Sequence, residues 1–379
     1  MKSKLKILYL LTSPLSVNTF GIQQIKALHE YGFAVYLVCG PGDLNPELSK
    51  FTTSIHISPY LRRVSSPIWD FISVINLCLT ILRIKPTIII YSTPKSALLG
   101  ALASFANRTP IRIYQVWGVR WQNLSGIKLW LIRSADFLAI TLSTKVLVVS
   151  KSVLHFISAH YESKKMIVLG SGSTTGVDTK IFYPNKSLFD SKPQLKVGYA
   201  GRVSNDKGVS DLFSVFVRLT SQLSNLYLEI IGDLDLNDKI SNKLVSDINS
   251  HSKIQWRRNI PQDKLAEQMR SWDLQIFLSR REGLGNVILE AGACGVPTFC
   301  WSIIGTKDAI PDFAQDFLIP YGDTDLLEKS IIRYLNSPFT QNEKSALTHW
   351  YQKNFEQKKV LTNFIEFIDD NLEEYYDSK

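Results

Sequence analysis

Two cations beside a glycine turn are the first residues in this sequence that could do chemistry. Segment 197–208 reads Val-Gly-Tyr-Ala-Gly-Arg-Val-Ser-Asn-Asp-Lys-Gly, so Arg202 and Lys207 lie between a buried apolar run and a helix expected to begin near Gly208. A helix N-terminus offers free N–H groups and positive potential. Two cations placed there suit a diphosphate, although the same pair standing alone could equally be surface charges on a solvated turn.

Two glutamates further along the chain form a second candidate site. Glu282 stands just after an expected strand, and Glu290 lies eight residues later on an expected helix. Gly283 and Gly285 between them allow backbone to approach a ligand closely. One carboxylate could face a reacting sugar and the other a ribose diol. In the plainer alternative, Glu290 pairs with a surface lysine and Glu282 caps the helix.

Several other kinds of site lack their sequence markers. The chain has no P-loop, no His-Glu-x-x-His and no Gly-x-Ser-x-Gly. Thr175 stands where a dinucleotide fingerprint beginning at Gly170 would need its third glycine. The four cysteines have no Cys-x-x-Cys spacing and no histidine at zinc spacing. We therefore expect reduced thiols in a cytosolic protein and no structural metal.

The elements that must position these residues alternate between strands and helices, which predicts βαβ units and parallel sheets. Strands are expected at 6–11, 34–39, 87–91, 111–116, 145–149, 166–169, 195–200, 226–231, 274–277 and 298–300. Helices are expected at 21–31, 68–83 and 151–159, from Gly208, near Pro261 and from Asn286. The predicted fold class is α/β, with two doubly wound Rossmann-like domains facing a central cleft that holds the site.

Length and charge divide the chain in two. The 379 residues predict an N-terminal domain at 1–188 and a C-terminal domain at 189–349, and helices at about 350–379 could pack back on the first. Residues 1–190 carry a net charge of +13 and residues 191–379 a net −4. This asymmetry suggests an anionic partner for the first half: nucleic acid, an anionic bilayer or a phosphorylated acceptor.

The motifs together resemble glycosyltransferase family 4. The resemblance is carried by Gly201-Arg202 with Lys207-Gly208, by Glu282 and Glu290, and by the run Ala-Gly-Ala-Cys-Gly-Val-Pro at 291–297. Further matches lie at 92–95, 118, 176–178 and 305–310. The resemblance implies a GT-B fold, retention of anomeric configuration, and no metal or cofactor beyond a nucleotide-sugar co-substrate.

Site roles follow from the same resemblance. It implies that Arg202 and Lys207 hold the donor diphosphate, Glu290 the ribose hydroxyls and Glu282 the donor sugar. The catalytic residues that the resemblance implies are Glu282, Arg202 and Lys207. Besides Arg202, Lys207 and Glu290, the implied donor-binding positions are Gly201, Gly285, Asn286, Val287 and Ile288.

On the acceptor side, the implied residues are Gly21, Lys95, Trp117 and Gly118. The family often has two glycines opening its first helix, where this chain has Phe20-Gly21, and often His-Gly where this chain has Trp117-Gly118. The tryptophan could stack on a sugar or pack in the core.

Polysaccharide-assembling members of the family extend lipid-linked sugars, and Lys95 and Gly118 match that subgroup. We therefore expect transfer of a hexose or N-acetylhexosamine from a UDP-sugar to a polyprenyl-diphosphate-linked glycan in bacterial surface polysaccharide synthesis, with no nucleic acid partner. The protein is expected at the inner face of the cytoplasmic membrane, held by an anionic surface. The candidate contacts are Arg62, Arg63, Lys128 and Arg133, beside Tyr60, Val64 and Trp69.

The expected helix 68–83 has a narrow polar stripe of Asp70, Ser73, Asn76, Thr80 and Arg83 and a wide apolar arc. We expect that arc to pack between the sheet and its neighbours.

Three alternatives stay open at this point. A nucleotide-sugar 2-epimerase would use the same fold without an acceptor, and a non-catalytic partner subunit would use it without a reaction. Asp233-Leu234-Asp235 could also mark a metal-dependent transferase of a different fold, although this short motif occurs easily by chance.

Overall fold

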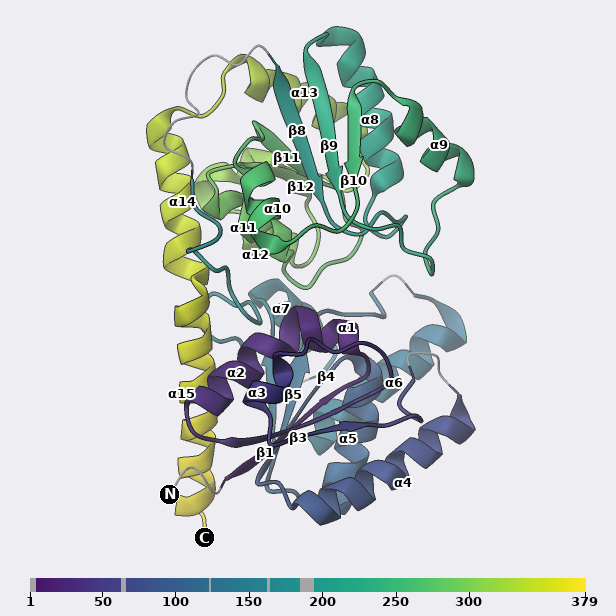
Figure 1. Cartoon of the computed structure of the whole chain (residues 1–379), viewed down its shortest axis with the longest axis vertical. Helices are drawn as coiled ribbons and strands as arrows, with labels where there is room; N and C mark the ends of the chain where they lie inside the picture. The colour runs from purple at the N-terminus through teal and green to yellow at the C-terminus, as the bar shows by residue number, and fades with distance from the viewer. Residues whose placement is uncertain (1–4, 63–65, 123, 162–163, 185–193) are drawn as a thin grey trace. The chain divides into compact units, whose positions relative to one another are not determined.

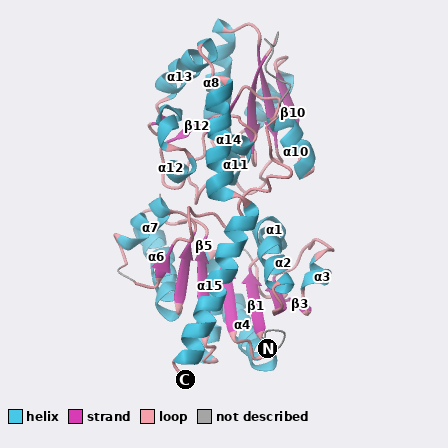
Figure 2. Cartoon of the chain, turned by 90° about the vertical axis from the view of Figure 1, so that its left-hand side faces the viewer, coloured by secondary structure: helices cyan, strands magenta, loops and turns pink. Residues whose placement is uncertain are grey.

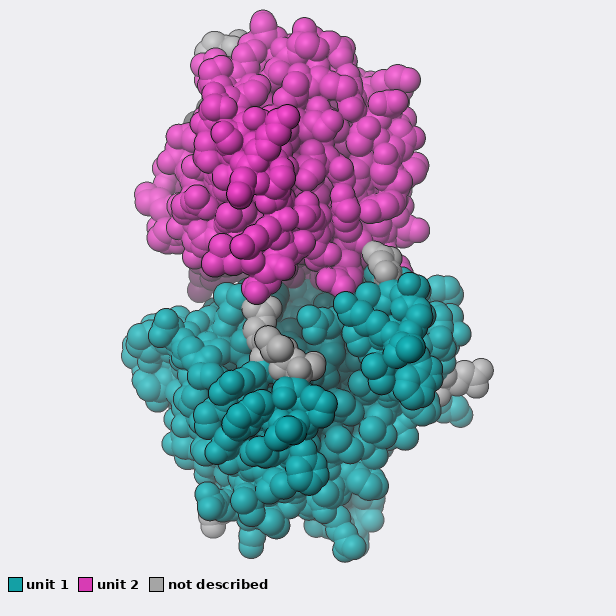
Figure 3. All heavy atoms as spheres, turned by 90° about the vertical axis from the view of Figure 1, so that its right-hand side faces the viewer, with its two compact units in different colours: residues 1–175, 358–379 teal, residues 176–357 magenta. Residues whose placement is uncertain are grey.

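The chain folds into two compact units, which are coloured separately in Figure 3. The computed structural model describes residues 5–62, 66–122, 124–161, 164–184 and 194–379. Unit 1 comprises Met1–Thr175 and Lys358–Lys379, and unit 2 comprises Gly176–Gln357. The expected boundary between residues 188 and 189 lies outside the described residues.

Unit 1 is built on a parallel sheet of seven strands in the order β3-β2-β1-β4-β5-β6-β7. Its strands are β1 (Lys6–Leu11), β2 (Ala34–Cys39), β3 (Ser54–Ile57), β4 (Ile88–Ser92), β5 (Ile111–Val116), β6 (Lys145–Val148) and β7 (Met166–Ile167). Its helices are α1 (Pro14–Ser16), the π-helix η2 (Val17–Gly21), α2 (Ile22–Glu30), α3 (Leu48–Phe51), α4 (Pro67–Ile84), α5 (Pro94–Ala106), α6 (Gly126–Leu142), α7 (Lys151–Ser158) and α15 (Gln357–Asp377).

Helices cover both faces of this sheet because β1 is buried on both sides. Ile7, Tyr9 and Leu11 join a core cluster with residues of α2 and α15. Leu10 faces the other way, toward Gly100 of α5, where an added Cβ would lie 2.7 Å from the Leu10 side chain. Figure 2 shows α15 lying across one face of the sheet, so the C-terminal helix completes the core of unit 1.

Unit 2 repeats the architecture with six parallel strands in the order β10-β9-β8-β11-β12-β13. Its strands are β8 (Leu195–Ala200), β9 (Leu226–Ile231), β10 (Ile254–Arg257), β11 (Leu274–Phe277), β12 (Thr298–Trp301) and β13 (Leu318–Ile319). Its helices are α8 (Val209–Gln222), α9 (Asn242–Ser250), α10 (Gln262–Met269), α11 (Asn286–Ala293), α12 (Thr306–Ala309), the 3-10 helix η3 (Asp312–Phe317), α13 (Thr324–Asn336) and α14 (Gln341–Phe355). The prediction of two parallel α/β domains is confirmed.

Helix α4 packs in the opposite sense to the prediction. Ser73 and Thr80 of the polar stripe are buried, and each hydroxyl donates a hydrogen bond to a carbonyl one turn earlier in the helix. Asp70 of the same stripe pairs with Lys95 of α5 at 2.5 Å. The expectation that the apolar arc is covered was therefore wrong for most of the arc: Leu77 and Ile81 are buried beside these polar groups, and the other apolar residues face outward.

Candidate active site

The strand order of unit 2 brings its two charged motifs together. β8 and β11 are neighbours, and the strand order reverses between them, which is where open parallel sheets form their ligand crevice. The turn after β8 carries Arg202 and Lys207, and the loop after β11 carries Glu282. The Lys207 ammonium forms an ion pair with the Glu282 carboxylate, and both side chains are mostly buried.

Further contacts fasten these two loops to each other. The backbone N–H of Arg280 donates to the carbonyl of Asp206 at 2.8 Å. The Arg281 guanidinium lies 3.4 Å from the Asp206 carboxylate, and Lys207 Nζ lies 3.4 Å from the buried Ser279 hydroxyl. The loops therefore hold Lys207 and Glu282 in a defined place before any ligand arrives.

Arg202 has a partner that the sequence did not indicate. Its guanidinium is half exposed and forms an ion pair with the largely buried carboxylate of Asp235. Burial raises the pKa of Asp235, but the Asn237 backbone N–H and the Arg202 charge together lower that pKa below its usual value. The ionised Asp235 carboxylate thus holds the Arg202 side chain near the end of β8.

The Asp233-Leu234-Asp235 motif is occupied by protein contacts. Asp235 pairs with Arg202, and the Asp233 carboxylate accepts a hydrogen bond from the backbone N–H of Asn259 at 3.2 Å. Among the described residues, no group of three or more His, Cys, Asp or Glu side chains is placed to hold a metal ion.

The N-terminus of α11 contributes uncharged residues and backbone N–H groups to the site. Gly285 precedes the helix with a φ of +88°, and no side chain among the described residues caps it. Asn286 and Val287 are half-buried, whereas the side chain of Ile288 is buried in the core, so Ile288 can offer only backbone to a ligand. Gly305 packs close by, because an added Cβ there would lie 2.8 Å from the Glu282 carbonyl oxygen.

Glu290 lies on α11 itself and is half-buried. Burial raises its pKa to about 8, and a hydrogen bond with Gln262 opposes part of that rise. A carboxylate with few compensating contacts is well suited to accept hydrogen bonds from a ligand's hydroxyls. Gln262 is a further site residue that sequence reasoning missed, since a glutamine at the start of α10 carries no distinguishing signal.

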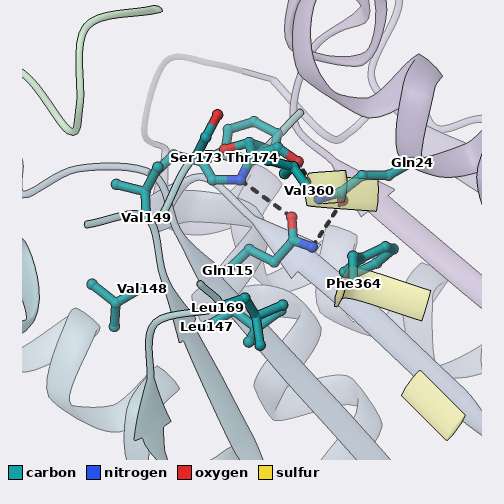
Figure 4. A pocket seen from close by; sticks show the side chains of 11 residues that line it. Gln24, Gln115, Leu147, Val148, Val149, Leu169, Ser173, Thr174, Val360 and Phe364 are labelled. Carbon is teal, nitrogen blue, oxygen red and sulfur yellow. Dashed lines mark hydrogen bonds between the residues drawn. The ribbon is translucent and has the colours of Figure 1, made fainter. Parts of the chain in front are cut away.

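The equivalent point of unit 1 carries a neutral network rather than ion pairs. The Gln115 side-chain oxygen accepts hydrogen bonds from Tyr9 at 3.2 Å, Ser92 at 3.0 Å and Trp117 at 3.2 Å. Its amide donates to the Gln24 side chain at 2.8 Å, and Figure 4 shows the two glutamines pointing toward each other. Gln115 and Gln24 line a cavity of about 30 Å³, which is enough for about two water molecules.

The residues implied for the acceptor side lie after strands of the unit 1 sheet or next to the start of its helices. They are Gly21, Lys95, Trp117 and Gly118. Gly21 ends η2, and an added Cβ there would lie 3.1 Å from Leu11. The Trp117 ring lies 5.0 Å from the Phe20 ring, so packing fixes the tryptophan, and Gly118 follows with a φ of +155°. Lys95 stands at the start of α5, paired with Asp70.

Thr93 was part of a matched motif but not a predicted site residue, and its backbone marks it out. It has a φ of +71°, which is strained for a residue with a branched Cβ. Its hydroxyl lies 2.7 Å from the Thr12 hydroxyl and 2.7 Å from the Ser96 hydroxyl. These bonds tie the end of β4 to the end of β1, where the strand order of unit 1 reverses.

The two α/β units have the GT-B fold, which is shared by solved glycosyltransferase structures. Anabaena HepE in complex with UDP-glucose superposes with a TM-score of 0.78 at 18% identity, over 97% of this chain and 100% of that one. Residues 181–354 match the family model of glycosyl transferases group 1, which spans most of unit 2. That part of the chain is therefore similar to the group 1 glycosyl transferases.

Two relatives are similar to this chain over most of its length. The chain is 26% identical to the capsular polysaccharide biosynthesis glycosyltransferase CapM of Staphylococcus aureus over 93% of both chains. It is 24% identical to the Escherichia coli UDP-Gal:alpha-D-GlcNAc-diphosphoundecaprenol alpha-1,3-galactosyltransferase, over 87% of this chain and 88% of that one.

Proposed function

We propose that this protein is a retaining, metal-independent glycosyltransferase that moves a hexose or N-acetylhexosamine from a UDP-sugar to a polyprenyl-diphosphate-linked glycan. The observation that carries the proposal is the meeting of Arg202, Lys207 and Glu282 where β8 and β11 end. Two cations beside a carboxylate and a free helix terminus match a ligand with a diphosphate next to a sugar.

The cations stabilise the leaving group. As the bond from the anomeric carbon to the diphosphate oxygen breaks, negative charge grows on the diphosphate, and Arg202 and Lys207 are already held in place to meet it. The backbone N–H groups at the start of α11 add to this field. The acceptor hydroxyl oxygen forms the new bond to the anomeric carbon, and its proton passes to the departing diphosphate oxygen, so no side-chain nucleophile is needed.

The two glutamates bind different parts of the donor. Glu282 holds the sugar hydroxyls next to the reacting carbon, which requires it to give up or share its ion pair with Lys207 as the diphosphate takes over the ammonium. Glu290 accepts hydrogen bonds from the ribose hydroxyls. The UDP-glucose bound in HepE supports a nucleotide-sugar donor for this fold.

Unit 1 takes the acceptor, with Gly21, Lys95, Trp117 and Gly118 nearest to it. The named acceptor of the Escherichia coli relative, a GlcNAc-diphosphoundecaprenol, supports a lipid-linked substrate. The name of CapM supports a role in capsule or related surface polysaccharide synthesis. Such an acceptor resides in a bilayer, so we place the protein at the inner face of the cytoplasmic membrane.

Radiolabelled UDP-sugars tested with and without a bacterial membrane extract decide the proposal. We expect label in the lipid fraction only when the extract is present, and the same yield after EDTA treatment. An isomerised donor formed without extract would instead identify a 2-epimerase. Absence of both products across a panel of UDP- and GDP-sugars would leave a partner subunit and overturn the proposal.

A further inference from the structure

The outer side of α4 is an exposed apolar stripe. Five of its residues at spacings of three and four point outward, with exposed fractions from 46% for Ile75 to 72% for Ile68. The stripe consists of Ile68, Phe71, Ile75, Leu79 and Leu82. The inward side of the helix is mixed, since Ser73 and Thr80 are buried beside Leu77 and Ile81. A helix that exposes an apolar stripe of this length is placed for an apolar environment outside the protein rather than for water.

Helix α6 presents a second apolar stripe in the same layer. Ile127 is 78% exposed and Trp130 is 67% exposed, and Leu131 and Leu138 follow on the same helix. α5 packs against both α4 and α6 and exposes Phe105 at its end. Figure 1 shows the three helices on the side of the unit 1 sheet away from α15. We call the exposed apolar residues of these three helices the α4–α6 apolar face.

The charges around this face have one sign. Residues 66–142 contain eight lysines and arginines against two acidic residues. Neither acid is free on the surface, since Asp70 pairs with Lys95 and Asp136 is buried. The exposed cations at the ends of α4, α5 and α6 are Arg62, Arg83, Lys85, Arg108 and Lys128.

We propose that the α4–α6 apolar face is the surface by which this protein sits on an anionic lipid bilayer. The apolar side chains enter the acyl-chain boundary, and the surrounding cations contact the lipid phosphates. The inference deepens the proposed function, because it names the partner surface that would bring a lipid-linked acceptor to unit 1.

Helix α4 lies along the bilayer in this proposal. It is long and apolar enough to cross a membrane, and 22% of it is buried within the protein. Three residues of its polar stripe, however, are committed to unit 1: Ser73 and Thr80 are buried, and Asp70 pairs with Lys95. A crossing orientation would strip these groups of their partners at a cost of several kcal/mol. A second copy of the chain is also a poor occupant, because two-fold pairing would bring the same cations against each other.

The N-terminal end of α4 is arranged for the membrane surface. The Arg62 guanidinium carbon lies 5.2 Å from the centre of the Trp69 ring. The Tyr60 ring stacks on the same Trp69 ring, with the two ring centres 5.7 Å apart. Aromatic rings with a polar edge favour the boundary between lipid and water. Arg63 and Val64, which the sequence also suggested, lie outside the described residues.

Cosedimentation with vesicles tests the proposal without donor or acceptor, so its outcome is separate from that of the transfer assay. Vesicles of phosphatidylcholine with phosphatidylglycerol should retain the wild-type protein, and removing phosphatidylglycerol or raising salt should release most of it. Phe71→Glu/Ile75→Glu and Trp130→Glu/Leu131→Glu should each weaken partitioning at least about tenfold. Circular dichroism should show unchanged folding, because all four side chains point outward.

Phe313→Glu is the matched control, since Phe313 is 56% exposed on unit 2, and it should partition like wild type. Vesicles with brominated acyl chains give an independent reading: they should quench tryptophan fluorescence, and Trp130→Phe should lose much of the quenching while still binding. Equal binding by wild type and both glutamate pairs would overturn the proposal. So would a dimer in vesicle-free sedimentation that both glutamate pairs dissociate.

Discussion

The two units have different polar groups at the point where the order of their parallel strands reverses. In unit 2, the reversal of strand order between β8 and β11 is lined by ion pairs, Arg202 with Asp235 and Lys207 with Glu282. In unit 1, the reversal between β1 and β4 is lined by neutral hydrogen bonds centred on Gln115. Charges that already have partners can exchange them for a charged ligand, whereas a buried neutral network resists rearrangement.

This difference predicts two kinds of response to mutation. Substitutions in the unit 2 site should mainly change kinetics, since Arg202 is half exposed and both cations are placed to meet a charged ligand. Substitutions in the unit 1 network should change stability, because they leave buried donors without acceptors.

The largest expected effect is on turnover. Arg202→Ala and Lys207→Ala should each lower kcat on the order of 10²-fold or more, because each removes a cation from the developing diphosphate charge. Initial rates at saturating donor measure this. Lys253→Ala is the control, since the half-buried Lys253 donates a hydrogen bond to the Ser224 carbonyl, outside the site motifs, and its loss should leave the rate unchanged. Near wild-type turnover in both site variants would refute the diphosphate assignment.

Next come the two glutamates, which should be kinetically distinct. Glu282→Gln should lower kcat with a smaller change in KM, because Glu282 acts beside the reacting carbon. Glu290→Ala should chiefly raise the KM for donor through loss of ribose hydrogen bonds. Full donor-dependence curves separate the two parameters. Equal and mild effects would mean that both residues serve only to support the loops.

In unit 1 the corresponding test is thermodynamic. Gln115→Met keeps the side-chain volume but removes the acceptor of Ser92 and Trp117, so the free energy of unfolding should fall by about 2 kcal/mol. Gln222→Met, at a solvent-exposed site in unit 2 where the amide donates one hydrogen bond to Glu328, should change it by less than about 1 kcal/mol. Denaturant titration gives both values, and a stable Gln115→Met protein would remove the contrast between the units.

The sequence predicted most of the fold because its central strands are continuous apolar runs. The runs at 6–11 and 195–200 coincide with β1 and β8. The short strands β3, β10 and β13 were missed, because edge strands such as Ser54–Ile57 are half-exposed and include polar residues. The packing of α4 was predicted wrongly because the hydroxyls of Ser73 and Thr80 are satisfied by carbonyls of the helix itself, so polar residues of the stripe can be buried.

The site was predictable to a similar degree and for a similar reason. Glycine turns at the ends of apolar strands locate Arg202, Lys207 and Glu282. The pairing of β8 with β11 then brings these three residues together. The partner Asp235 comes from the loop after β9 and the partner Gln262 from the start of α10, and nothing in their spacing links them to the motifs. Pairing across separate loops depends on the three-dimensional path of the chain, which local patterns do not encode.

The smallest expected effect is a pH dependence confined to Glu290. Burial raises its pKa to about 8, so the side chain is mostly protonated at pH 7 and mostly ionised at pH 9.

If only the carboxylate accepts bonds from the ribose hydroxyls, the Kd for UDP should fall up to about tenfold over this interval, since the ionised fraction rises by that factor. The sign for stability is opposite: the folded state binds the proton more tightly than the unfolded chain, so this group's contribution to stability declines as pH rises from about 4.5 to about 8. Glu290→Gln keeps the shape without the titration, and calorimetry should find both its UDP affinity and its stability flatter with pH than those of wild type. A variant whose UDP affinity still tightens toward pH 9 would place the titrating group elsewhere in unit 2.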